Sequence, residues 1–282
     1  MGRDIRGLTG WGSWLGQVGF QARTDNGDPS RTLDVEIGMS PRVALSLAVI
    51  ASAMSTGAVH AEPRAVIELF TSQGCSSCPP ADQLAGEFAR DPSIIVMSLP
   101  IDYWDYLGWK DTLALPGHTN RQRAYARSRG DREVYTPQVV VNGSVHVLGS
   151  DKDAIENAIV QTDKQPGTLS LPVTLSVANG QISASVPATK SAAAKGEVWL
   201  CPITKDVPVT IGRGENTGHT VTYHNVVRRW IKLGDWNGTA HTFMLPVRDI
   251  GAGDFDSVAV VVQSGTKEAP GAMLGANAVA LR

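Results

Sequence analysis

Cys75 and Cys78 are the two residues of this chain whose type and spacing best suit chemistry. They stand two serines apart in the stretch GCSSCPP. Such a pair can form a redox-active disulfide, hold half of a metal site or act as a structural link. The chain has three cysteines in all, too few for a disulfide framework or a four-cysteine zinc site. We therefore predict a redox pair with no metal and no cofactor besides the disulfide. Metal binding or a permanently oxidised pair are the alternatives.

The compartment of the chain supports the redox interpretation. Residues 39–61 read MSPRVALSLAVIASAMSTGAVHA, with a positive charge, a short apolar core and a small-x-small cleavage site, as in a secretory signal peptide. Residues 1–38 are expected to be a mis-called upstream start or a disordered extension. A secreted or periplasmic bacterial protein meets an oxidising environment, in which a cysteine pair can be oxidised.

Composition excludes several classes of partner. The formal net charge is −2 and 42% of the residues are hydrophobic, as in an ordinary globular protein. The chain has no polybasic stretch, so we expect no nucleic-acid partner. The apolar core of the signal is far shorter than the roughly 20 residues that a membrane span needs. We therefore expect no stable membrane span after signal cleavage.

The elements around the two cysteines are predicted from hydrophobic runs and turn signals. The order β-α-β-α-β-β-α follows from segments 65–70, 79–89, 94–99, 119–129, 138–141, 145–148 and 150–162. This alternation favours a parallel core with an added hairpin, which is predicted to turn at Asn142-Gly143. A thiolate at a helix N-terminus faces unpaired backbone N–H groups, which lower its pKa. Cys75 is therefore predicted to be the exposed nucleophile, and Cys78 the buried resolving thiol.

The pattern changes after the sequence QPG at 165–167. Two strands joined by Asn179-Gly180 follow, and further strand-like runs, one of them at 220–233, continue to the end of the chain. Seven or eight short strands without helices are typical of a β-sandwich. We predict two domains, 62–165 and 168–282. Cys201 lies in one of these strands and is interpreted as a buried free thiol.

The first half resembles the thioredoxin-like superfamily. The resemblance rests on the C-x-x-C between a strand and a helix, and on Thr136-Pro137 ahead of the segment 138–141. It implies a cis-proline opposite the cysteines, with Thr136 pairing with the substrate backbone and Pro137 shaping the groove. The predicted fold class is thus α/β: a thioredoxin-like N-terminal domain followed by an all-β, sandwich-like C-terminal domain.

An aromatic segment, DYWDYLGWKD at 102–111, follows the second predicted strand. The carboxyl end of that strand points to the same face as the cysteines. We predict that Asp102, Tyr103 and Trp104 belong to the substrate groove. The alternative is an aromatic plug that packs a loop or the interface to the β domain.

A closer resemblance covers nearly everything after the signal. The stretches ELFTSQGCSSCPPAD, DYWDYLGWKD, RQRAYA, YTPQVVVNG and RGENTGHTVTYHNVVRRW resemble a secreted bacterial family known as domain of unknown function 1223. This resemblance implies a contact of Glu215 and Asn216 between the domains near the site. The predicted function is a thiol-disulfide oxidoreductase that acts on protein thiols and disulfides. The alternative is a non-catalytic binding module for a metal or a protein, with the β domain as the interaction surface.

Overall fold

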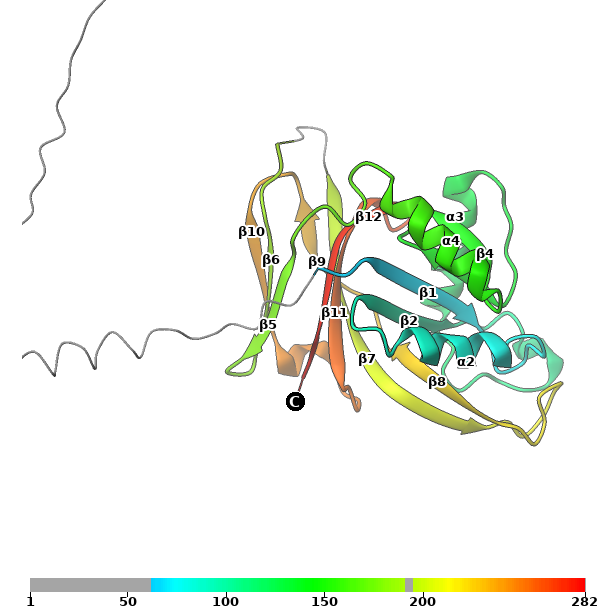
Figure 1. Ribbon diagram of the computed structural model, residues 1–282. Coiled ribbons are helices and arrows are strands. Elements are labelled where there is room, and N and C mark those ends of the chain that lie inside the picture. Colours follow the sequence, from blue (N-terminus) through cyan, green and yellow to red (C-terminus); the bar gives the residue numbers. More distant parts are fainter. Residues whose placement is uncertain (1–61, 191–194, 282) are drawn as a thin grey trace, which may run out of the picture. The chain divides into compact units, whose positions relative to one another are not determined.

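The computed structural model describes residues 62–190 and 195–281. The predicted extension 1–38 and the signal peptide 39–61 lie outside these residues. The elements run in the order β1 (Ala65–Thr71), α2 (Pro79–Phe88), β2 (Ile94–Pro100), η1 (Asp105–Leu107), α3 (Pro116–Arg129), β3 (Gln138–Val141), β4 (Val145–Leu148) and α4 (Lys152–Asp163). The second half adds β5 (Thr174–Ala178), β6 (Gln181–Val186), β7 (Gly196–Thr210), β8 (Thr220–Val227), β9 (Ile231–Trp236), β10 (His241–Pro246), η2 (Val247–Ile250), β11 (Ser257–Thr266) and β12 (Ala269–Ala280). Figure 1 shows this course.

One large mixed sheet joins the two halves of the chain. Within the described residues it has nine strands in the order β12-β11-β7-β8-β2-β1-β3-β4, with β9 also paired to β7. β1 and β2 are parallel, and β8 joins β2 in parallel through Ser98 and Val226. The Ser98 hydroxyl reinforces this join by donating to the His224 carbonyl at 2.6 Å.

The predicted fold class is therefore wrong. The protein is mostly β, with three α-helices in the part described, rather than a thioredoxin-like domain followed by a separate sandwich-like domain. The physical reason is the pairing of β8 with β2. Buried strands hydrogen-bond along both edges, so the sheet of the first half continues into the strands of the second.

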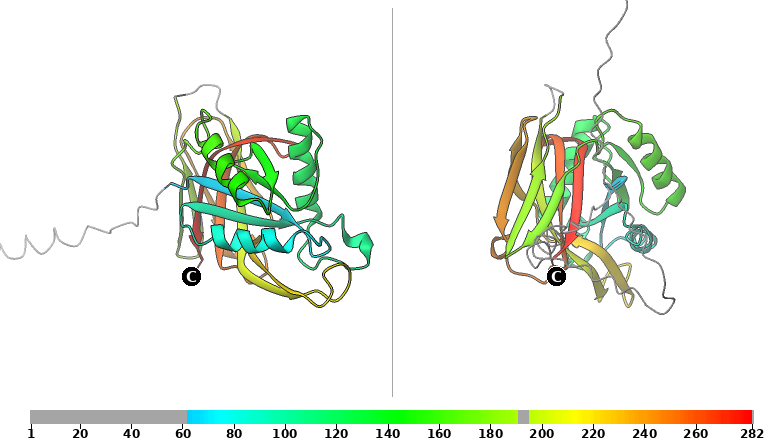
Figure 2. Two further views of the ribbon diagram at one scale, coloured as in Figure 1. Left: turned by 45° about the vertical axis from the view of Figure 1, so that its right-hand side comes forward. Right: turned by 60° about the vertical axis from the view of Figure 1, so that its left-hand side comes forward.

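A second sheet covers part of the large one. It consists of β10, β6 and β5 in that order, and Figure 2 shows it as a layer beside β11 and β12. Leu175 and Ile182 from this layer share a core with Leu200, Val260 and Trp236 of the large sheet.

The helices pack around the first-half strands. Leu84 of α2 and Ile155 of α4 share a core with Ile67 of β1 and Val139 of β3. Tyr125 of α3 belongs to another core, which also holds residues of β2, β7 and β11. No helix in 62–190 or 195–281 is long and apolar enough to cross a membrane.

Several local predictions are confirmed. Asn142-Gly143 and Asn179-Gly180 both form hairpin turns with positive φ, at 50° and 70° and at 52° and 74°. Two consecutive positive φ values are what a type I′ turn requires. The segment after 167 carries eight strands, β5 to β12. The strand-like run at 220–233 is interrupted, however, because residues 228–230 leave the sheet between β8 and β9.

Gly86 marks a close approach of α2 to β8. A Cβ at this position would overlap the ring of His224, which Asp206 holds through a 2.7 Å contact to Nδ1. We expect Gly86→Ala to lower the free energy of unfolding by about 1–3 kcal/mol, as overpacking does. Gly117→Ala in α3 is the control, because a Cβ there meets no atom within 4 Å. Urea unfolding measures both, and equal stability of the two variants would contradict this packing.

Candidate functional site

Cys75 and Cys78 form a disulfide between the end of β1 and the start of α2. Their Cα atoms are 5.4 Å apart. Cys78 is the N-cap residue of α2, and prolines occupy the first two helical positions. Proline has no N–H group, so this first turn offers fewer free donors to a thiolate than the motif alone indicates.

The prediction that Cys75 is exposed is wrong for this oxidised state. Cys75 is 2% exposed and Cys78 is fully buried. Trp104 packs against the backbone just before Cys75: a Cβ on Gly74 would lie 3.1 Å from the Trp104 Cβ. Access to the sulfur atoms therefore requires movement of the surrounding loops.

The Thr136–Pro137 peptide bond is cis, as predicted. It lies beside the disulfide, because the Thr136 carbonyl oxygen is 3.6 Å from the Cys75 Sγ. The Ser77 hydroxyl is 3.5 Å from the same carbonyl and 3.4 Å from the same sulfur. Thr136 and Pro137 are thus brought to the cysteines, and Ser77 joins them.

The aromatic segment closes one side of this group. Trp104 Nε1 donates to the Thr136 hydroxyl at 2.8 Å, and its ring stacks on Tyr106. Tyr103 is partly buried next to Trp104, and burial raises the pKa of its phenol. Trp104 therefore lies beside Thr136 and the cysteine loop. Its place in a substrate groove, and that of Tyr103, stays a prediction.

Asp102 pairs through its carboxylate with a residue of α3, and its place in a substrate groove stays a prediction. Its carboxylate accepts the Thr119 hydroxyl at 2.5 Å, and the Thr119 oxygen accepts the Asp102 backbone N–H at 3.2 Å. These contacts fix the chain between β2 and α3. Asp105, similarly, accepts the Asp111 N–H at 3.0 Å. Asp102 thus has its partner in α3, and Asp105 has its partner in the loop between β2 and α3.

The turn that joins β7 to β8 covers the other side of the disulfide. Asn216, 4% exposed, donates to the carbonyl oxygens of Gln73 and Cys75, each at 2.9 Å. The Glu215 carboxylate accepts the Ser76 N–H at 3.3 Å. Both residues therefore contact the C-x-x-C loop directly, and a carboxylate beside this loop opposes the development of negative charge there.

Comparison with known proteins identifies the chain. A family model described as "Protein of unknown function (DUF1223)" matches residues 66–263. The chain belongs to the DUF1223 family. The crystal structure of the protein AGR_C_4864 from Agrobacterium tumefaciens is similar, with 30% identity and a TM-score of 0.70 over 79% of this chain and 96% of that one.

A more distant solved structure shares the fold of this DUF1223 protein. HBP35 of Porphyromonas gingivalis matches with a TM-score of 0.52 and 14% identity, over 78% of this chain and 76% of that one. No curated protein sequence matches the chain.

Asp82 is a residue of this DUF1223 site that the sequence interpretation missed. It lies four residues after Cys78 on α2 and is 1% exposed. Neither carboxyl oxygen has a hydrogen-bond partner of good geometry among the described residues. Burial raises the pKa of Asp82 well above its ordinary value, nearby Asp111 raises it further, and the Thr71 hydroxyl lowers it.

Asp111 and Gln73 form the base of the same loop. Asp111 accepts the backbone N–H of Gln73 at 2.8 Å, and the Gln73 side chain accepts Trp109 Nε1 at 2.8 Å. The aromatic segment and the cysteine loop are thereby fixed to each other. A polar residue buried in this way has no sequence signal, since Gln73 reads as an ordinary loop residue.

Cys201 lies apart from this group in the DUF1223 fold. It is a free, fully buried thiol in β7, as predicted, and burial raises its pKa. In residues 62–190 and 195–281 no cluster of three or more His, Cys, Asp or Glu side chains is arranged to hold a metal ion.

Proposed function

We propose that the Cys75–Cys78 pair exchanges disulfides with protein thiols, which makes the chain a thiol-disulfide oxidoreductase. The observation that carries this proposal is the contact of the Cys75 sulfur with the carbonyl of Thr136, 3.6 Å away. This contact places the disulfide, a bond that can form and break reversibly, next to the backbone carbonyl of the residue before Pro137. A substrate strand can pair with such a backbone once the aromatic side chains move aside.

In the reductive direction the cycle begins with both thiols reduced. The Cys75 thiolate attacks one sulfur of a substrate disulfide, and the other substrate sulfur leaves as a thiolate that takes up a proton. Cys78 then loses its proton, and its thiolate attacks the Cys75 sulfur. The mixed disulfide breaks, the second substrate thiol leaves, and the Cys75–Cys78 disulfide forms. Two electrons pass to the substrate, and the same steps run backwards for substrate oxidation.

Two side chains support individual steps of this cycle. The Ser77 hydroxyl, 3.4 Å from the Cys75 sulfur, can donate a hydrogen bond to the thiolate. Asp82 lies one helical turn after Cys78, on the same face. Burial raises its pKa towards that of a thiol, which suits proton exchange with Cys78: the carboxyl accepts the Cys78 proton when it is ionised and returns a proton when it is protonated.

The substrate site in this proposal consists of Thr136 and Pro137 with Tyr103 and Trp104 as its wall. Substrates are protein thiols and disulfides, and the reaction uses no cofactor besides the cysteine pair. We propose the periplasm or the extracellular space as the location, because residues 39–61 have the character of a signal peptide. Thiols arriving there meet oxidising conditions.

Burial of both sulfur atoms favours one alternative. A pair that is 2% and 0% exposed resembles a structural disulfide, which remains oxidised while the protein binds a partner. Structural disulfides have low reduction potentials, below about −300 mV, and resist reduction by glutathione. The two functions therefore differ in a measurable property.

A redox titration separates them. The purified protein is equilibrated in dithiothreitol or glutathione buffers, its thiols are alkylated, and the mass is read. We expect Cys75 and Cys78 to change together as a two-electron couple, with a tenfold change in the equilibrium for about 30 mV. Turnover is measured with a model protein disulfide.

Variants in which one cysteine at a time is replaced by serine complete the experiment. Cys75→Ser and Cys78→Ser are expected to lose turnover, whereas Cys201→Ser, as the matched control, retains it. Turnover in the Cys75→Ser variant, or a pair that stays oxidised throughout the titration, would reject the oxidoreductase.

A further inference from the structure

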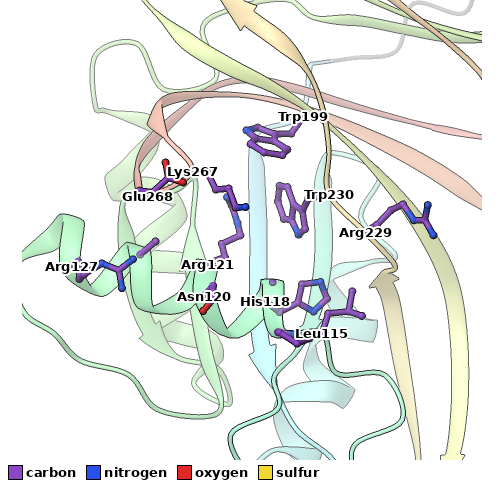
Figure 3. Close-up of a pocket in the computed structure, with 13 residues that line it drawn as sticks. Leu115, His118, Asn120, Arg121, Arg127, Trp199, Arg229, Trp230, Lys267 and Glu268 are labelled. Carbon is purple, nitrogen blue, oxygen red and sulfur yellow. The ribbon is translucent and has the colours of Figure 1, made fainter. Parts of the chain in front are cut away.

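A cavity of about 600 Å³ is lined by neither of the two cysteines. It is bordered by α3, by Trp199 of β7, by Trp230 between β8 and β9, and by Lys267 in the turn from β11 to β12. Figure 3 shows the side chains that meet there. Its volume falls within the range of about 300–1,000 Å³ typical of small-molecule sites.

Two tryptophans give the cavity an aromatic wall. The rings of Trp199 and Trp230 meet edge to face, with centroids 6.3 Å apart and planes at 75°. The guanidinium carbon of Arg121 lies 4.0 Å from the centroid of the Trp230 ring. Aromatic rings prefer to pack edge to face or offset-stacked against other aromatic rings. This wall therefore favours a flat aromatic body over a polar one.

Arg121 is a fixed charge in this wall. Its side chain is 9% exposed and pairs with the buried Glu68. Nη2 donates to the Tyr125 hydroxyl and to Gln263, each at 2.8 Å. No described residue accepts a hydrogen bond from Nη1. The guanidinium is thus rigidly held with one nitrogen unused.

Two buried polar atoms border the cavity without a partner in the described part of the chain. They are Nε2 of His118, a fully buried residue, and Nε1 of Trp230. His118 Nδ1 lies 3.0 Å from the Pro100 carbonyl, so we assign the proton to Nδ1 and leave Nε2 as an acceptor. Burial lowers the pKa of His118 to about 4, which keeps the ring neutral. Unsatisfied groups of this kind are uncommon in folded proteins.

The rim of the cavity is positively charged. Arg127 and Lys267 are exposed there, and Glu268 is the acidic residue among the lining side chains. Arg229 also borders the cavity. Its guanidinium packs so closely against Gly251 that a Cβ added to this glycine would overlap it. The Arg229 side chain points away from Trp230 in Figure 3. The charges near the opening therefore favour an anion.

We propose that this cavity binds a small aromatic carboxylate, with its ring against Trp199 and Trp230 and its carboxylate towards Arg127 and Lys267. The polar atoms within the wall select the orientation of the ring substituents. The cavity contains neither Cys75 nor Cys78, so the proposal stands independently of the redox function.

Calorimetric titration of the folded protein with two probes tests the charge preference. The probes are 2-naphthoate and 2-naphthalenemethanol, which have the same ring system, and one of them carries a negative charge. We expect 2-naphthoate to bind about tenfold tighter at low salt. Raising the salt concentration should reduce this advantage, because exposed charges are screened.

Variants at the rim test the location. Arg127→Gln combined with Lys267→Gln is expected to remove most of the tenfold advantage, and both residues are exposed, so the fold is retained. Arg123→Gln is the matched control, an exposed arginine of α3 outside the cavity lining. Trp230→Leu should weaken both probes. Equal affinity for the two probes, no binding of 2-naphthoate, or an equal effect of Arg123→Gln would overturn the proposal.

Discussion

Replacing Glu68 with glutamine is expected to lower the free energy of unfolding by about 3–5 kcal/mol, because it leaves a buried cation without its partner. Glu68 is fully buried and pairs with Arg121 Nε at 2.5 Å, and the Arg121 side chain is 9% exposed. The glutamine side chain has nearly the same shape, so the loss reports charge rather than packing. Urea unfolding at neutral pH measures it.

The effect is large because this pair belongs to a network that joins distant parts of the chain. Tyr125 of α3 donates to the other Glu68 oxygen at 2.5 Å. Gln263 of β11 accepts from Arg121 and donates to the Tyr125 hydroxyl at 2.7 Å. Removal of one charge therefore disturbs β1, α3 and β11 together, since buried networks lose more than their separate contacts suggest.

An exposed ion pair provides the control. Lys232 and Asp235 lie 2.7 Å apart, with side chains 39% and 77% exposed. Asp235→Asn is expected to cost at most about 1 kcal/mol, as surface pairs do. A double replacement, Glu68→Leu with Arg121→Met, should recover part of the loss, because it removes the unpaired charge. A Glu68→Gln variant no less stable than Asp235→Asn would show that the buried pair contributes nothing.

The sequence predicted local structure well and long-range pairing poorly. The run at 65–70, the turn at Asn142-Gly143 and the helix after Pro79 depend on neighbouring residues, and all three are present. The join of β8 to β2 depends on residues 128 positions apart, Ser98 and Val226. The stretch VTYHNVV reads as a strand in a sandwich or in a mixed sheet, because hydrophobic periodicity does not reveal which edge a strand pairs with.

Some residues of the candidate site were likewise predicted from the sequence, and others were not. Resemblance to known proteins predicted that Thr136 and Pro137 lie close to the cysteines, and they lie there in the structure. Asp102 reads as a carboxylate near the thiols, yet the neighbouring helix supplies its partner, Thr119. Asp82 reads as an ordinary first-turn acid, which favours a solvated position at the helix N-terminus. In the fold it is 1% exposed and faces Thr71 of β1, Tyr223 of β8 and Asp111, which no local pattern indicates.

Asp82→Asn is expected to stabilise the folded protein at neutral pH. Burial raises the pKa of Asp82 in the folded state, whereas the unfolded value is about 3.9. Below that pH both states hold the proton, and the carboxyl has no effect on the pH dependence. Above it the unfolded chain releases the proton while the folded chain keeps it. The free energy of unfolding of the wild type therefore falls by about 1.4 kcal/mol per pH unit until the pH reaches the pKa of Asp82 in the folded state.

The measurement is the difference in unfolding free energy between variant and wild type from pH 3 to pH 8, with the disulfide kept oxidised. It should be flat below about pH 4 and should grow in favour of the variant above it. The titratable groups that face Asp82 are Asp111 and Tyr223. Both are present in the two proteins, so their own titration largely cancels in the difference.

Asp91→Asn is the control, because its shift has the opposite sign. Hydrogen bonds from Ser93 lower the pKa of Asp91, so its carboxylate stabilises the folded state above the unfolded pKa and the variant should lose stability there. A pH-independent difference for Asp82→Asn, or a variant less stable at neutral pH, would show that Asp82 is ionised and well paired. A carboxyl that destabilises the folded protein calls for a functional reason.

Proton transfer with Cys78 is such a reason. Asp82→Asn should then also flatten the pH dependence of the step in which Cys78 resolves the mixed disulfide.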